Sequence, residues 1–120
     1  AAKPAAEKSE KKDGRNAPEP IALHLRALVL IDRGERRSAA QLLNDLRNGA
    51  PDYIPGLLER ALLHVREGEH KAATELMRVI MTRTESMPHD MNISGPETLP
   101  VTYYRATAQA FLDSSKQKAR

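Results

Sequence analysis

From Pro20 onward, apolar residues recur at intervals of three and four, the spacing that places them on one face of a helix. This first stretch ends at Asp32-Arg33-Gly34, where glycine tolerates the left-handed conformation that terminates a helix. Its apolar positions are Leu23, Leu25, Ala27, Leu28, Val29, Leu30 and Ile31. We therefore predict a helix that is buried on more than one side and ends just before Gly34.

Four further helices are predicted from the same kind of pattern. Residues 35–48 carry one apolar stripe and stop at Gly49-Ala50-Pro51, and residues 54–66 and 69–83 repeat this plan. A fifth helix is expected at 99–112. The small and apolar positions of helices two to four are Ala39, Leu42, Leu43, Leu46, Leu57, Ala61, Ala73, Leu76 and Met77.

Between the fourth and fifth helices, residues 84–98 are predicted to form a long exposed loop. The steps Met87-Pro88 and Ser94-Gly95-Pro96 oppose a continued helix there. After the fifth helix, only residues 116–120 are left for a partner helix, which is less than the start of a normal one. The fifth helix is therefore expected either to cap the array or to belong to a longer one.

An internal repeat is visible around the two turn glycines. The residues from Arg26 to Glu35 have the pattern Arg-Ala-Leu-x₅-Gly-Glu, which recurs 34 positions later from Arg60 to Glu69. A third copy follows at Arg105-Ala106 once an insertion of 11 residues is allowed, and Asp113 then stands at the place of the turn glycine. Repeats of this length indicate stacked units that share a core and offer an extended surface to partners.

These residues resemble the tetratricopeptide repeat, a helical hairpin with small residues in both helices, glycine at the turn and proline at the exit. Leu23 and Leu57 stand where the family has an aromatic residue, and the second copy lacks the exit proline. The matching residues are Ala27, Gly34, Ala39 and Pro51 in the first copy and Ala61, Gly68 and Ala73 in the second. The resemblance implies an all-α fold: a right-handed stack of antiparallel helix hairpins with repeats at 20–53 and 54–83 and a partial repeat at 97–120.

The amino-acid composition limits the classes of partner that the chain is expected to bind. The 120 residues carry 19 basic and 16 acidic side chains, a net charge of +3, which is weaker than the basic face of a dedicated nucleic-acid binder. The absence of cysteine excludes disulfides and cysteine-ligated zinc, and no apolar run approaches the roughly 20 residues that span a bilayer. Residues 1–19 have almost nothing to bury and are expected to be a disordered linker that follows another part of a larger cytoplasmic protein.

The tetratricopeptide resemblance implies a concave groove lined by the first helix of each hairpin. The groove positions are His24, Leu28, Ile31 and Asp32, then Leu58, Leu62, Val65 and Arg66, then Tyr103, Thr107 and Ala110. The set is mainly apolar and lacks the Lys/Asn/Arg group with which some family members hold a C-terminal carboxylate. We expect it to bind a hydrophobic or amphipathic segment of a partner protein. The alternative is that these residues pack against another helix of the full-length protein or a second copy of the chain.

No motif indicates an enzyme, a cofactor or a metal site. The sequence has no nucleophile paired with a base and no glycine-rich phosphate loop. Its histidines, His24, His64, His70 and His89, form neither an i,i+4 ligand pair nor a His-Glu-x-x-His arrangement. The Met87-Pro-His-Asp-Met91 segment has ligands for a soft metal, but its spacing is more typical of a flexible loop.

Two alternative functions belong to other classes. The chain could be the regulatory tail of a bacterial signalling enzyme, by analogy with tetratricopeptide tails of some chemotaxis receptor methyltransferases. Helical repeats that bind RNA are the other alternative, yet they recognise bases with polar side chains, whereas Leu28 and Leu62 are apolar. We therefore expect a protein or peptide partner, with no nucleic acid and no membrane insertion.

Overall fold

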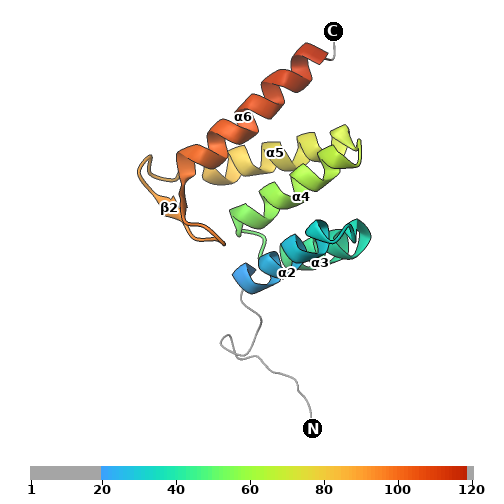
Figure 1. Ribbon diagram of the computed structural model, residues 1–120. Coiled ribbons are helices and arrows are strands. Elements are labelled where there is room, and N and C mark those ends of the chain that lie inside the picture. Colours follow the sequence, from blue (N-terminus) through green and yellow to red (C-terminus); the bar gives the residue numbers. More distant parts are fainter. Residues whose placement is uncertain (1–19, 119–120) are drawn as a thin grey trace.

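The computed structural model describes residues 20–118, which form five helices and one two-stranded sheet (Figure 1). The linker predicted at 1–19 lies outside the described residues. The elements are α2 (Pro20–Asp32), α3 (Arg36–Gly49), α4 (Ile54–Arg66), α5 (His70–Thr84), β2 (Asn92–Ile93), β3 (Leu99–Pro100) and α6 (Val101–Lys118). The predicted all-α class is confirmed, and the bounds of the first four helices agree with the sequence pattern to within one residue.

Each helix packs against the next one along the chain, and α4 also contacts α6 (Figure 1). The small residues Ala27, Ala39, Ala61 and Ala73 are fully buried, which allows close approach of the paired helices. Two apolar clusters result. The first joins α2, α3 and one side of α4 through Ala27, Ala39, Leu43, Leu46 and Leu63. The second joins α4, α5 and α6 through Ile54, Leu57, Leu58, Ala61, Leu76, Met77, Ile80, Tyr104 and Ala108.

The two repeat turns have the same backbone conformation. Gly34 and Gly68 have φ angles of 81° and 77°. After each glycine, the next amide donates a hydrogen bond of 2.8 Å to a carbonyl of the preceding helix, Glu35 to Leu30 and Glu69 to His64. The repeated glycines therefore end two helices by the same left-handed turn.

We expect Gly68→Ala to lower the free energy of unfolding by about 1–2 kcal/mol, because a Cβ atom is disfavoured at positive φ. A Cβ atom at Gly68 would have no neighbour within 4 Å, so the cost would come from the backbone alone. Gly49→Ala is the matched control, since Gly49 lies in a helix with equally open space around it. Urea unfolding measures both, and equal stabilities of the two variants would contradict the prediction.

Helix α6, where the sequence predicts a third copy, packs on α5, as α4 packs on α3. Arg60 donates from Nε to Asn44 Oδ1 at 2.9 Å, and Arg105 donates from Nη1 to Met81 O at 3.0 Å and to Thr84 Oγ1 at 2.8 Å. Each arginine thus reaches the helix before its own. Ala106 is exposed, unlike its counterparts in the first two copies, because the described residues supply no helix after α6.

Two features differ from the sequence-based expectation. Helix α6 continues to Lys118 and does not end near Leu112, since no glycine stands at the turn position to terminate it. The predicted exposed loop also contains β2, which pairs in antiparallel register with β3 so that Ile93 lies opposite Leu99. Strand β3 occupies Leu99–Pro100, where the fifth helix was predicted to begin, and α6 therefore starts at Val101. Ile93 and Leu99 pack against the second apolar cluster, and this burial explains why the segment is ordered into a hairpin.

The hairpin is held against α4 at its tip. A Cβ atom added to Gly95 would come within 3.0 Å of Pro55 Cγ, so the glycine allows a close approach. At the base, the Val101 amide donates to the Met91 carbonyl at 2.8 Å. The hairpin therefore forms a wall beside the first turns of α4 and α6 (Figure 1).

Candidate functional site

A hollow of about 170 Å³ lies between α2, α4, the β2–β3 hairpin and the start of α6. We call it the hairpin pocket. Its lining residues are His24, Leu28, Pro55, Leu58, Glu59, Leu62, Pro96, Glu97, Leu99, Tyr103 and Tyr104. Most of this surface is aliphatic or aromatic, and the charged side chains that the described residues contribute to it are two glutamates.

The structure brings five of the eleven predicted groove residues together in this pocket. They are His24, Leu28, Leu58, Leu62 and Tyr103. The others lie outside it, nearer the C-terminal ends of their helices or farther along α6: Ile31, Asp32, Val65, Arg66, Thr107 and Ala110. The β2–β3 hairpin covers the predicted groove only at the end where α4 and α6 begin. The structure therefore has a localised hollow at this end, and not the continuous row of groove residues that the repeat predicts.

The predicted residues that line the pocket differ in depth. His24 and Leu58 are buried and form its floor, and Leu58 belongs to the second apolar cluster. Leu62 is 40% exposed, and Tyr103 is similarly exposed at the start of α6. Leu62 and Tyr103 are therefore the apolar side chains that an incoming group meets first.

Sequence reasoning did not assign the hairpin residues or Glu59 to the site. Pro96 and Glu97 come from a segment with no helical or strand periodicity, and Leu99 was predicted to begin the fifth helix, so no local signal placed them beside α4. Glu59 directly follows Leu58 in α4, and helical adjacency to a predicted groove residue was the signal for it. Tyr104 is buried between helices and also touches the pocket.

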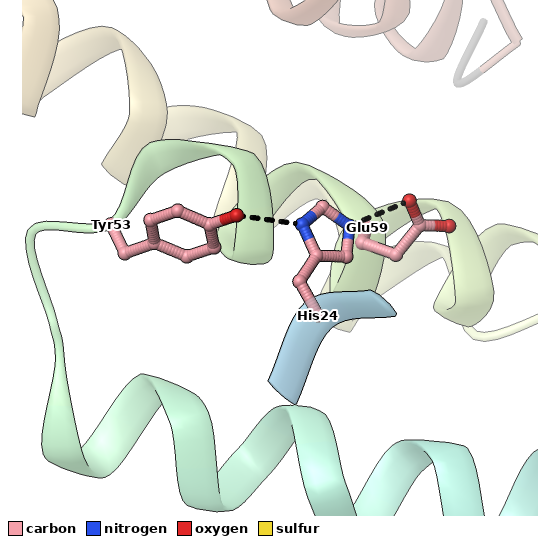
Figure 2. Close-up of polar contacts among 3 residues, drawn as sticks. All are labelled: His24, Tyr53 and Glu59. Carbon is pink, nitrogen blue, oxygen red and sulfur yellow. Dashed lines mark hydrogen bonds and ion pairs between the residues drawn. The ribbon is translucent and has the colours of Figure 1, made fainter. Parts of the chain in front are cut away.

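A hydrogen-bonded group connects α2 to α4 at the pocket floor (Figure 2). His24 Nδ1 lies 2.9 Å from the Tyr53 hydroxyl, and His24 Nε2 lies 3.2 Å from Glu59 Oε1. A neutral imidazole with its proton on Nε2 satisfies both contacts, because Nε2 then donates to the carboxylate and Nδ1 accepts from the hydroxyl. His24 therefore uses both ring nitrogens within the fold and serves as a link between helices.

The same three residues do not make an activated nucleophile. Burial raises the pKa of Tyr53 to about 12, with smaller contributions from nearby Tyr104 and Glu59. The phenol thus keeps its proton at neutral pH and acts as a donor to His24. Elsewhere, His64 contacts Glu69 at 2.7 Å, and no cluster of histidine and acidic residues within the described part of the chain could hold a metal ion.

The raised pKa of Tyr53 predicts a loss of stability at alkaline pH. An unfolded tyrosine releases its proton near pH 10.0, whereas folded Tyr53 holds its proton to about 12. Because the folded state then binds more protons, the free energy of unfolding falls as pH rises from 10 to 12. Tyr53→Phe should show a shallower fall in urea unfolding over this range. Burial also raises the pKa of Tyr104, so part of the slope remains in the variant, but an unchanged slope would contradict the assignment.

Comparison with known proteins does not place the chain in a family. No family model matches the chain, and neither does any curated protein or solved structure. None of the helices between residues 20 and 118 is long and apolar enough to cross a membrane. The pocket and the sequence repeat are therefore the features of the chain that bear on its function.

Proposed function

We propose that this chain is a protein-interaction module of the tetratricopeptide-repeat type that holds an apolar side chain of a partner protein in the hairpin pocket. The observation that supports this most strongly is a localised apolar hollow with Leu62 and Tyr103 exposed at its mouth. Contact with an apolar group would remove these side chains from water, which favours association. The module would position or regulate a larger protein to which it is attached.

The size of the pocket favours one side chain over a whole small molecule. Its volume of about 170 Å³ is close to that of an engineered apolar cavity of about 150 Å³ that admits benzene. Pockets for drug-sized ligands measure about 300–1,000 Å³. A leucine, methionine or phenylalanine side chain, presented by a peptide or by a helix, is the ligand that suits this hollow.

The charges around the pocket favour a protein over a nucleic acid. Glu59 and Glu97 line it, and no lysine or arginine of the described region does. Carboxylates repel phosphate groups, and helical repeats that bind RNA depend on polar contacts to bases. Attachment to a bacterial signalling enzyme stays a prediction that the sequence of the neighbouring region would test.

The test is a selection of randomised heptapeptides displayed on phage, with the immobilised chain as bait and its Leu28→Lys/Leu62→Lys variant as control. We expect the chain to enrich peptides with one bulky apolar residue and the variant to enrich none of them. Circular dichroism establishes that the variant keeps its helices. Enrichment of the same peptides by both baits, or of none by the unmodified chain, would contradict the proposal.

A further inference from the structure

We infer that the hairpin pocket selects an apolar side chain flanked by lysine or arginine, with Glu59 and Glu97 as the groups that recognise the cation. This inference rests on the proposed function and adds the chemistry of the partner. It comes from the distribution of charge around the pocket. The two glutamates stand on different walls, one on α4 and one on the hairpin, and the described residues that line the pocket include no lysine or arginine to neutralise them.

Glu59 keeps one carboxylate oxygen for a ligand. Its Oε1 atom is engaged by His24, while Oε2 has no hydrogen-bond partner among residues 20–116, and Figure 2 shows it directed away from the imidazole. The Glu59 side chain is only 23% exposed. Interactions of a partly buried carboxylate are less screened by water and salt than those of a surface carboxylate. An ammonium or guanidinium group beside the inserted apolar side chain would supply the missing partner.

Glu97 supplies the second negative charge from the opposite element. It lies near the hairpin tip, two residues after Gly95, whose backbone packs closely on Pro55. The side chain is exposed and forms no ion pair with the described residues. Because the tip is held against α4, this carboxylate stays at the pocket edge. A basic residue on either side of the apolar anchor can therefore meet one of the two glutamates.

Four fluorescein-labelled peptides test the inference by fluorescence polarisation. Each has Gly-Ser flanks and a central Lys-Leu-Lys, Gln-Leu-Gln, Glu-Leu-Glu or Lys-Ala-Lys core. We expect Lys-Leu-Lys to bind most tightly, with an advantage over Gln-Leu-Gln of about 2- to 30-fold for two partly exposed ion pairs. Glu-Leu-Glu should bind most weakly of the three leucine peptides because it places like charges together, and Lys-Ala-Lys should bind poorly because it lacks the anchor.

Charge-neutral variants of the two glutamates identify the source of this preference. Glu59→Gln/Glu97→Gln should bind Lys-Leu-Lys and Gln-Leu-Gln equally. Glu75→Gln/Glu85→Gln is the matched control, since it changes the net charge equally at exposed glutamates outside the pocket lining and should keep the full preference. Glu97→Gln alone, which leaves the contact between His24 and Glu59 intact, should lose part of the preference for Lys-Leu-Lys. This single variant keeps the test valid if the double variant is less stable.

The possible results separate this inference from the proposed function. If Gln-Leu-Gln binds as tightly as Lys-Leu-Lys, selection of a basic flank is wrong while binding of an apolar anchor stands. If the basic preference survives in Glu59→Gln/Glu97→Gln, the two glutamates are not its source and the inference is overturned. If none of the four peptides binds, both the inference and the pocket as a docking site fail.

Discussion

Replacing Leu57 by alanine is expected to lower the free energy of unfolding by about 2–5 kcal/mol, the range measured for buried leucine truncations. Leu57 is 2% exposed and lies in the cluster that joins α4, α5 and α6. The substitution removes apolar contacts and leaves a cavity that the surrounding helices fill only in part. Since small domains are stable by about 5–15 kcal/mol in total, this single change should shift the urea midpoint strongly.

Leu25→Ala is the control for this result. It is the same chemical change in another helix, but Leu25 is 48% exposed. Leucine and alanine have similar helix propensities, so the control should alter the free energy of unfolding by no more than about 0.5 kcal/mol. Equal losses in the two variants would mean that the second cluster is not the core of the molecule.

Replacing Leu62 by lysine is expected to weaken binding of a leucine-containing peptide by well over tenfold. A tenfold loss corresponds to about 1.4 kcal/mol, and full burial of a leucine side chain contributes about 1.5–3 kcal/mol. Leu62 is 40% exposed at the pocket mouth, so partner binding would bury much of the side-chain surface that is still in contact with water. Lysine also places an ammonium group where the partner's apolar side chain must enter, and desolvating this charge opposes binding.

Leu25→Lys is the control for binding. Leu25 is similarly exposed, lies on α2 outside the pocket lining, and acquires the same charge. Fluorescence polarisation with the Lys-Leu-Lys peptide should give an unchanged affinity for Leu25→Lys, with helicity retained in both variants. A similar loss in both variants would indicate non-specific charge repulsion, and no loss in Leu62→Lys would remove the pocket as the binding site.

The candidate site was only partly predictable. The spacing from Leu28 to Leu62 follows from the repeat, and the structure places both residues in one pocket. Glu97 could not be assigned because the hairpin has no periodic pattern, and its position depends on the contact between Gly95 and Pro55. His24 was predicted to face a ligand, yet both of its ring nitrogens are engaged within the protein.

The sequence by itself determined the helices of the first two repeats and their turns, because these depend on interactions between residues near one another in the chain. Helical periodicity and the left-handed turns at Gly34 and Gly68 are of this kind. Only the tertiary structure decided which side chains form the pocket. Glu59 meets His24 across 35 residues, and the hairpin is held on α4 by packing that no short segment encodes. Such long-range contacts depend on how whole elements pack together, so the position of the site became visible only in three dimensions.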